Sequence, residues 1–423
     1  MAEWGIFTRR RFIRDGLSLV GMGASVPSFL CSTVEALAGP DSSDPSRRSG
    51  DHRILVVLQM AGGNDGLNTI IPIRQDPYYR ARPTLAIKPD QVLSLDKELG
   101  LHPSAVGLKS LFDDGYLSIV GGVGYPNPNR SHFKSTDIWA TASPDGRQHE
   151  GWLGRYFDHE CSGEDPIDPK LGLALVQEAP LAMRGSQFLP VAFEKAERLS
   201  LRGIGGDRVT AEVIAAFNRP DEDQVSNPST TLEFLRRTAL DAKLSADEIR
   251  TAATTPVGKV SFPGSALGKS LRTIHRMIAA GLPTRVYYVS QGGFDTHANQ
   301  GGRHGGLLAD LGNSLRAFVA ALKASGDLDR TLLMTFSEFG RRVQENASRG
   351  TDHGAAAPMF LVGGQVHPGL HGQSPSLERL RDGDLPYTID FRRVYATVLQ
   401  DWLKSDPVKI LHGRFKPLRL IKT

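Results

Sequence analysis

Short apolar runs recur along the chain, and each is followed by glycine or a polar residue. Runs of this length, without regular polar positions, are typical of strands that are buried on both faces of a parallel sheet. The predicted strands are Ile54–Leu58, Leu117–Val120, Arg285–Val289, Thr331–Phe336 and Met359–Val362. The pattern therefore predicts a central sheet that is mostly parallel.

Between these runs, apolar residues recur every three or four positions, which predicts amphipathic helices. Leu307–Leu322 precedes the fourth strand, and Leu271–Ile278 precedes the third. A further helix is predicted over Phe391–Trp402, with Asp390 as its N-cap. Helices that alternate with buried strands indicate a doubly wound α/β fold.

Two stretches interrupt this pattern. Residues 39–50 are rich in serine, proline and charged residues, and we expect a linker there. The stretch from about 161 to 265 is irregular, with one helix predicted near Leu232–Leu244. We interpret it as an insertion or cap joined to the sheet, so that residues 51–423 form one domain.

The N-terminus has the pattern of an export signal. Adjacent arginines in Thr8–Arg14 precede a weakly apolar stretch, and Ala36–Ala38 supplies small residues at a cleavage position. Residues 1–38 therefore resemble a twin-arginine (Tat) signal peptide. A basic amphipathic helix or a membrane anchor is the alternative, but the apolar stretch is shorter than the roughly 20 residues that cross a bilayer. We expect export by the Tat translocase to the periplasm or the exterior, with no stable membrane span.

Charge and cysteine content narrow the classes of function. The net charge is +4 over 423 residues, and no basic stripe with interleaved aromatic residues is present. We therefore expect no nucleic-acid partner. Cleavage of the signal would remove Cys31 and leave Cys161 alone, so no internal disulfide can form in the mature chain.

Acidic residues and histidines follow several of the predicted strands. Because parallel strands place their carboxyl ends at one edge of a sheet, we expect these side chains to meet there. Carboxylate and imidazole donors suit Zn²⁺, Mn²⁺ or Mg²⁺, so we predict one or two divalent metal ions. The predicted ligands are Asp65, Asp295, His297, Glu338, Asp352 and His353.

Several of these residues also have simpler explanations. Asp65 lies in a Gly-Asn-Asp-Gly turn, where it would be the N-cap of a helix. Ser131 stands at a predicted helix start, either as an N-cap or as a nucleophile that a metal and the helix dipole activate. His132 is either a buried structural histidine or a catalytic one.

Arginine and amide side chains near these positions suit anion binding. Arg130 is placed to fork onto the oxygens of a phosphate or sulfate. Arg341 either pairs with Glu338 or binds the substrate, and Asn64 is a second predicted substrate contact. We therefore assign Ser131, Arg130 and His132 to catalysis.

Five motifs in order suggest a family. They are Gly62-Gly63-Asn64-Asp65, Asn129-Arg130-Ser131-His132-Phe133, Gly292-Gly293-Phe294-Asp295-Thr296-His297, Ser337-Glu338-Phe339-Gly340-Arg341 and Thr351-Asp352-His353-Gly354. With the Tat signal, they resemble the bacterial family catalogued as domain of unknown function 1501. That family is grouped with the alkaline phosphatase and sulfatase superfamily.

The resemblance implies an alkaline-phosphatase-like α/β/α sandwich with divalent metals and a hydroxyl nucleophile at a helix start. Ser131 resembles that nucleophile, and Asp65 resembles the first-strand carboxylate that ligates metal. Asp295 and His297 resemble the paired acid and histidine of one metal site, and His353 resembles its late histidine. Glu338 resembles the acid of the other site. Two features depart from the superfamily: the spacing of Asp295 and His297 is short, and Phe339 replaces a histidine.

Two functions follow from these observations. The first is an exported metal-dependent hydrolase that acts on phosphate esters, of small molecules or polymers, through Ser131. Sulfate esters are the less favoured substrate, because neither Ser131 nor Cys161 has the proline and arginine that follow a formylglycine site. The second is a non-enzymatic periplasmic binding or assembly protein on a phosphatase-like scaffold, suggested by Phe339.

Overall fold

The computed structural model describes residues 53–162, 167–196, 199, 245–373 and 376–422. The predicted signal peptide, the linker at 39–50 and the predicted helix near Leu232–Leu244 lie outside these residues. None of the described helices has the length and apolar character needed to cross a membrane.

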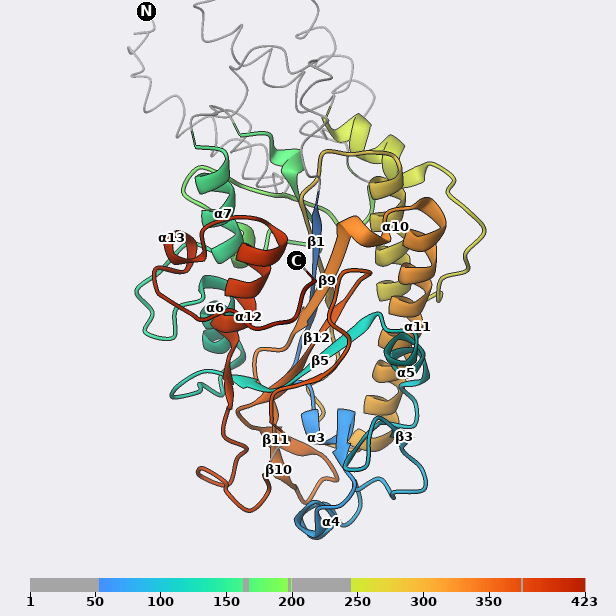
Figure 1. Ribbon diagram of the computed structural model, residues 1–423, viewed down its shortest axis with the longest axis vertical. Coiled ribbons are helices and arrows are strands. Elements are labelled where there is room, and N and C mark those ends of the chain that lie inside the picture. The colour runs from blue at the N-terminus through green and yellow to red at the C-terminus, as the bar shows by residue number, and fades with distance from the viewer. Residues whose placement is uncertain (1–52, 163–166, 197–198, 200–244, 374–375, 423) are drawn as a thin grey trace, which may run out of the picture.

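A nine-stranded sheet forms the centre of the molecule (Figure 1). Its strands lie in the order β13-β5-β12-β9-β1-β8-β6-β7, and β14 also pairs with β5. The bounds are β1 (Ile54–Met60), β5 (Leu117–Gly124), β6 (Gly172–Leu175), β7 (Val191–Ala192), β8 (Val286–Gln291), β9 (Thr331–Phe336), β12 (Ala357–Val362), β13 (Gly369–His371) and β14 (Ile389–Asp390). All five predicted strands are therefore present.

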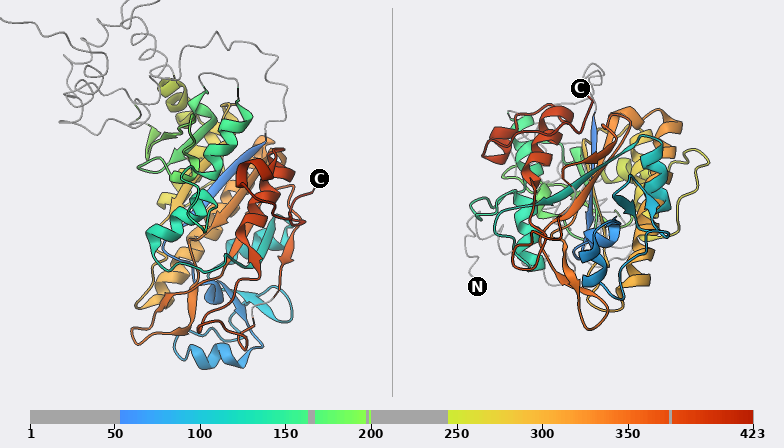
Figure 2. Two further views of the ribbon diagram at one scale, coloured as in Figure 1. Left: turned by 90° about the vertical axis from the view of Figure 1, so that its left-hand side faces the viewer. Right: turned by 60° about the horizontal axis from the view of Figure 1, so that its bottom comes forward.

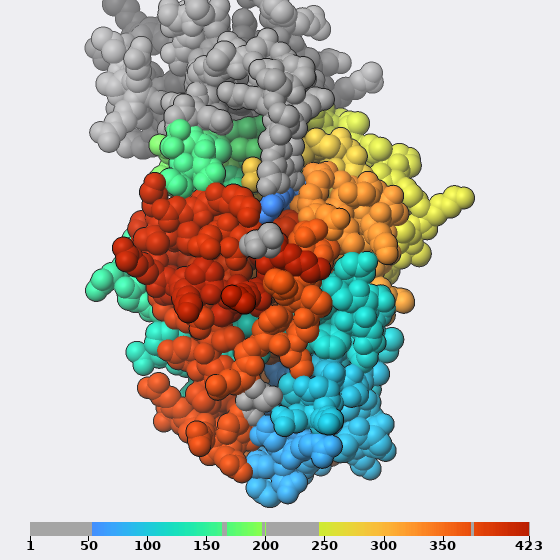
Figure 3. Space-filling model, viewed as in Figure 1, coloured from blue at the N-terminus to red at the C-terminus, as the bar shows by residue number. Residues whose placement is uncertain are grey.

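Helices cover both faces of the sheet (Figures 1 and 2). One layer holds α5 (Val106–Asp113), α10 (Ala266–Ala279) and α11 (Gln300–Ser325), and the other holds α6 (His132–Thr141), α7 (Trp152–Glu160), α12 (Phe391–Thr397) and α13 (Pro407–Leu411). Figure 3 shows the C-terminal part of the chain, in red, covering the α12 side.

Strand β1 shows how the sequence builds these three layers. Ile54, Val56 and Leu58 enter the core beneath α10 and α11, whereas Leu55 and Val57 enter the core beneath α7 and α12. Successive side chains of a strand point to opposite faces, so a continuous apolar run fills two cores at once. The predicted α/β/α sandwich is confirmed.

One strand of this mostly parallel sheet runs in the opposite direction. Strand β12 runs antiparallel to both of its neighbours, β9 and β5. The segment between β9 and β12 contains the antiparallel pair β10 (Arg341–Glu345) and β11 (Thr351–His353) in place of a helix. A parallel return needs a long crossover, usually helical, so this connection brings the chain back antiparallel.

The predicted helices are also present. Residues 271–278 and 307–322 lie within α10 and α11, and 391–402 forms α12 followed by a π-helical turn (Val398–Trp402). Asp390 caps α12 by accepting a hydrogen bond from the Arg392 backbone N–H, as predicted. Three 3₁₀ turns complete this part of the fold: Pro169–Leu171, Leu181–Met183 and Leu328–Arg330.

Two groups of elements were not predicted. The irregular stretch from 161 to 265 adds β6 and β7 to the edge of the sheet, both parallel to their neighbours. A small antiparallel sheet follows β1, with α3 (Gly66–Thr69), β2 (Ile70–Pro72), α4 (Asp76–Ala81), β3 (Leu93–Ser94) and β4 (Leu99–Leu101). This sheet lies beyond the carboxyl end of β1 (Figure 1).

Candidate metal centre

The carboxyl ends of three adjacent strands, β9, β1 and β8, carry the predicted site residues. Glu338 follows β9, Gly62 and Gly63 follow β1, and Asp295 follows β8. Gly62 has φ +118°, and a Cβ at that position would overlap the Asp295 backbone nitrogen. Only glycine lets the two strand ends approach this closely, which places Asp295 beside the end of β1.

Imidazole and carboxylate donors meet at this edge. One donor atom each from His132, Asp295 and His353 lies within 4.8 Å of the others. The Nε2 atom of His297 lies 3.0 Å from Asp295 Oδ1 and 2.9 Å from His353 Nε2. The four residues come from the start of α6, the segment after β8, and β11.

Each histidine of this cluster is oriented through its Nδ1 atom. His353 Nδ1 lies 2.8 Å from the Arg130 carbonyl oxygen, His132 Nδ1 lies 2.9 Å from Glu338 Oε1, and His297 Nδ1 lies 3.1 Å from Asp352 Oδ1. Carbonyl and carboxylate oxygens accept hydrogen bonds, so each Nδ1 is assigned the proton. The Nε2 lone pairs are therefore left for a metal, the usual arrangement around histidine ligands.

The donor set fits a divalent cation. Burial lowers the pKa of His353 below its ordinary value and favours the neutral ring. Two Nε2 lone pairs only 2.9 Å apart repel each other unless a positive charge lies between them. Three imidazole nitrogens with one carboxylate are typical ligands of zinc, and they also suit manganese.

Asp295 supplies the negative charge of the cluster. Burial alone would raise the pKa of Asp295, but the hydrogen bond and positive charge of Arg341 outweigh it and lower the pKa to about 2. Arg341 Nη2 lies 2.6 Å from Asp295 Oδ1, while Asp295 Oδ2 lies 3.6 Å from His132 Nε2. The carboxylate is therefore ionised at neutral pH.

Arg341, predicted to bind the substrate, is buried and connects four segments. Its guanidinium donates to the carbonyl oxygens of Gly62, Gly63, Phe294 and Thr351 as well as to Asp295. These contacts hold the ends of β1 and β8 against β11. Arg341 therefore lies buried beneath the site, and its guanidinium is engaged by protein groups.

Asp65 lies outside the cluster. Its carboxylate is fully buried, pairs with Arg82 at 2.6 Å, and caps α3 by accepting from the Asn68 backbone N–H. Burial would raise the pKa of Asp65, but the charge and hydrogen bond of Arg82, with smaller contributions from His304 and Gln300, keep the pKa below its ordinary value. In this structure Asp65 therefore caps α3 and pairs with Arg82.

Asn64 is buried as well. Its backbone N–H donates to Ser337 Oγ at 2.9 Å, and its Oδ1 lies 3.0 Å from Thr69 Oγ1 and 3.1 Å from His304 Nε2. These contacts fix the turn after β1. They direct the Asn64 side chain oxygen into the protein.

Ser131 stands between two residues that contact the cluster. The Arg130 carbonyl accepts from His353, and the His132 ring reaches Asp295. Ser131 is the N-cap residue of α6, its side chain makes no capping hydrogen bond, and it is exposed. The Arg130 guanidinium forms an ion pair with Asp384.

Glu338, Asp352 and Phe339 surround the histidines. Glu338 Oε1 also accepts from the Gly62 backbone N–H at 2.8 Å, whereas its Oε2 atom is buried without a partner among the described residues. Asp352 accepts from Asn346 at 3.1 Å. Phe339 is buried, with its ring centroid 4.9 Å from His132 and 4.4 Å from His353. The two acids orient histidines in this structure.

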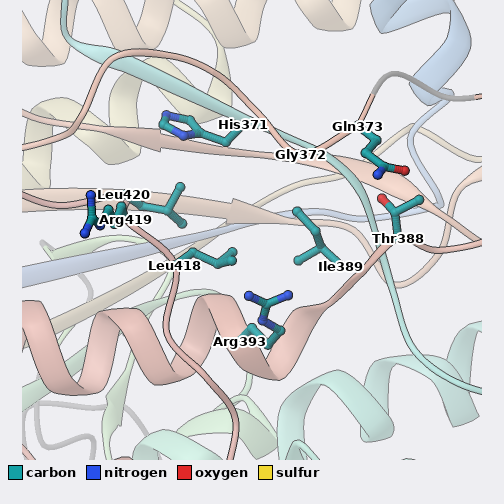
Figure 4. A pocket seen from close by; sticks show the side chains of 9 residues that line it. All are labelled: His371, Gly372, Gln373, Thr388, Ile389, Arg393, Leu418, Arg419 and Leu420. Carbon is teal, nitrogen blue, oxygen red and sulfur yellow. The ribbon is translucent and has the colours of Figure 1, made fainter.

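A cavity of about 490 Å³ lies elsewhere, between β13, β14 and the C-terminal residues (Figure 4). Its lining residues include His371, Ile389, Arg393 and Leu418, and none of the predicted site residues. This cavity is therefore separate from the cluster of predicted site residues at the carboxyl ends of the strands.

The structure brings together Asp295, His297 and His353, which the sequence grouped as ligands, and His132, which the sequence assigned to catalysis, lies beside them. The position of His132 one residue after a helix N-cap was the available signal that it turns toward the strand ends. The sequence did not predict that Asn346 and Gln300 belong to the site, because no local motif indicates a role for either residue.

Comparisons with known proteins agree with the motifs. The family described as "Protein of unknown function (DUF1501)" matches residues 121–412, which include every member of the cluster. The family resemblance is therefore confirmed. Among proteins with curated descriptions, none matches this sequence.

Similar solved structures are distant. The lipoteichoic acid synthase LtaP from Listeria monocytogenes has 10% identity and a TM-score of 0.32, over 81% of this chain and 73% of that one. The C-terminal periplasmic domain of EcEptC from Escherichia coli, in complex with Zn, has 11% identity and a TM-score of 0.32, over 78% and 76%. The phosphonate monoester hydrolase SpPMH from Silicibacter pomeroyi has 12% identity and a TM-score of 0.29, over 86% and 76%. Likenesses this weak carry no argument about activity.

Proposed function

We propose that this chain, which belongs to the family of proteins of unknown function DUF1501, is a metal-dependent hydrolase of phosphate esters. The observation that carries the proposal is the convergence of three oriented histidines on the Asp295 carboxylate, with an exposed serine at a helix start immediately before His132 in the sequence. Small-molecule and polymer esters are both compatible with a site at the protein surface.

Ser131 is the proposed nucleophile. The positive end of the ten-residue helix α6 favours the ionised form of the Ser131 hydroxyl. Its Oγ atom attacks phosphorus, the bond from phosphorus to the ester oxygen breaks, and the alcohol leaves with a proton. Water then attacks the phosphoserine and releases phosphate, which restores the hydroxyl.

The cluster would hold the cation next to this serine. A bound divalent ion neutralises the oxygens of the transferring group and lowers the pKa of a nearby hydroxyl. His132, Asp295, His297 and His353 would be its ligands, while Glu338 and Asp352 would orient His132 and His297.

These contacts support one ion. Glu338, the acid that would serve a second site, is engaged with His132, and Asp65 is engaged with Arg82. Three imidazole donors favour zinc or manganese over magnesium, which prefers oxygen ligands. We also propose Tat export to the periplasm or the exterior, on the strength of residues 8–38 alone.

The test combines metal content with hydrolysis. The exported chain is purified without chelator, its metals are measured, and p-nitrophenyl phosphate is supplied with and without added zinc or manganese. We expect about one equivalent of metal, and a loss of at least 100-fold in kcat for Ser131→Ala with the metal retained. Ser265→Ala is the matched control, since Ser265 is the N-cap of α10 far from the cluster in sequence. Equal rates for the Ser131 variant and the parent would rule out this nucleophile.

A second function is supported by one observation. Arg130 is held by Asp384 and Arg341 is buried beneath the site, so neither arginine named as an anion contact faces the cluster freely. A non-enzymatic binding or assembly protein on this scaffold would bind metal without turning over any ester. Tight binding to an envelope polymer, with no hydrolysis across phosphate and sulfate esters, would favour it.

A further inference from the structure

A buried glutamine connects the two segments that carry the candidate ligands. Gln300 is the first residue of α11 and is fully buried. Its Oε1 atom accepts from Thr296 Oγ1 at 3.0 Å and from Thr351 Oγ1 at 2.6 Å. Its Nε2 atom donates to Asp65 Oδ2. Asp65, Thr296 and Thr351 are also fully buried.

The chemistry of these partners allows one orientation of the amide. Two hydroxyl donors face the Gln300 oxygen, and a carboxylate that can only accept faces the nitrogen. A flipped amide would place its oxygen against the Asp65 carboxylate, so that two acceptors would face each other, whereas the threonine hydroxyls can either donate or accept. Asp65 is itself fixed by the Arg82 ion pair and by its position as the cap of α3. The network therefore has a rigid anchor.

The two threonines are adjacent to the ligands in sequence. Thr296 lies between Asp295 and His297, and Thr351 lies two residues before His353. The Thr351 backbone N–H also donates to the Thr296 carbonyl at 3.2 Å. One amide thus acts with Arg341 to fix the separation of the segment after β8 from β11, and with it the distance between the His297 and His353 rings.

We propose that Gln300, anchored by Asp65, is a positioning residue that sets the affinity of the cluster for its divalent cation. The inference rests on the proposed metal site, but not on hydrolysis. It also gives Asp65 a role: the aspartate that the sequence predicted as a ligand acts on the metal through Gln300 and the two threonines.

The test compares two buried glutamines. Gln300→Met keeps the size and apolar volume of the side chain but removes the amide. Gln291→Met is the control, because Gln291 is also buried and donates to Leu307 and Asp310, neither of which adjoins a ligand. Zinc affinity is measured by competition with a chromogenic chelator, and thermal unfolding of the metal-free proteins is measured alongside.

We expect Gln300→Met to weaken zinc binding about 10- to 100-fold, as loss of groups behind histidine ligands does, and Gln291→Met to weaken it less than threefold. The visible absorption of the Co²⁺-substituted protein should change in the first variant alone. Thr351→Val removes a single hydroxyl, so it replaces Gln300→Met if that variant does not fold, and Thr351→Ser should restore the affinity.

Equal zinc affinity in the parent and in folded Gln300→Met would overturn the inference, whether or not the protein hydrolyses esters. Equal losses in both glutamine variants would do the same, because the effect would then reflect general stability. A parent that binds zinc and shows these differences, yet hydrolyses no ester, would support the inference and overturn the proposed function.

Discussion

The buried ion pair between Arg82 and Asp65 gives a prediction whose sign depends on pH. Both side chains are fully buried, and Arg82 also donates to Asn68 Oδ1 and to the carbonyl oxygens of Arg342 and Val343. Arg82→Met removes the charge and these hydrogen bonds while keeping an extended apolar side chain. Breaking such a pair by removing one partner costs about 3–5 kcal/mol.

The pH dependence of the unfolding free energy separates the effect of the Arg82 charge from the effect of its hydrogen bonds. In the parent, the pKa of Asp65 lies below the ordinary value of 3.8, so the pair stabilises the protein above that pH and loses its effect as the pH falls through the folded pKa. In Arg82→Met, burial is no longer offset by Arg82, and the folded pKa rises above the unfolded one. The sign then reverses: stability is highest at low pH and falls by about 1.4 kcal/mol per pH unit until Asp65 ionises.

A second variant isolates this contribution. Arg82→Met with Asp65→Asn lacks both charges but shares the lost contacts to Arg342 and Val343. Free energies of unfolding are measured by urea titration at pH 4.5 and 7.5, in chelator, so that metal binding does not contribute. We expect the unfolding free energy of the double variant to exceed that of the single variant by about 3–4 kcal/mol at pH 7.5 and by about 1 kcal/mol or less at pH 4.5. A constant difference between them would refute the reasoning that Asp65 is held ionised by Arg82.

Three further predictions concern the candidate metal centre. Gly62→Ala should destabilise the protein by about 1–3 kcal/mol and weaken metal binding, because φ is +118° and the new Cβ overlaps the Asp295 backbone; urea titration and metal analysis check this. Asp295→Asn should lower zinc affinity at least 10-fold in chelator competition, since it removes the anionic donor among the imidazoles. Removal of metal should lower the unfolding free energy by about 2.7 kcal/mol relative to protein in free zinc at 100 times the dissociation constant. A Tm, measured by calorimetry, that does not change when zinc is added would contradict a zinc site in the native state.

The parts of the fold that the sequence predicted are those whose pattern is local. Strand β1 follows from a continuous apolar run, because both of its faces are buried, and helix α11 follows from apolar periodicity, because one of its faces is buried. Strand β6 is only four residues, Gly172–Leu175, and such a short run has no readable period. The direction of β12 depends on the connection before it, which apolar content does not report.

The candidate site also contains residues that a local sequence pattern predicts and contacts that no local pattern predicts. Asp295, His297 and His353 follow strand ends or glycine turns, and that local signal was enough to place them together. The Asp65 carboxylate is instead bound by Arg82, which lies 17 residues away in the chain, and by Gln300, which begins the distant helix α11. Pairing of this kind is set by tertiary structure, so no spacing rule reveals it.

The short spacing between Asp295 and His297 has a physical explanation in the burial of this segment. Phe294 and Thr296 are buried, while Asp295 is exposed and His297 is half-buried. Burial therefore alternates along the segment: one pair of side chains anchors it, through the core and through Gln300, and the other pair faces the cluster. Both donors consequently converge near His353, with His297 Nε2 only 3.0 Å from Asp295 Oδ1. A spacing of two residues is thus suited to a single compact site, in keeping with the proposal of one metal ion.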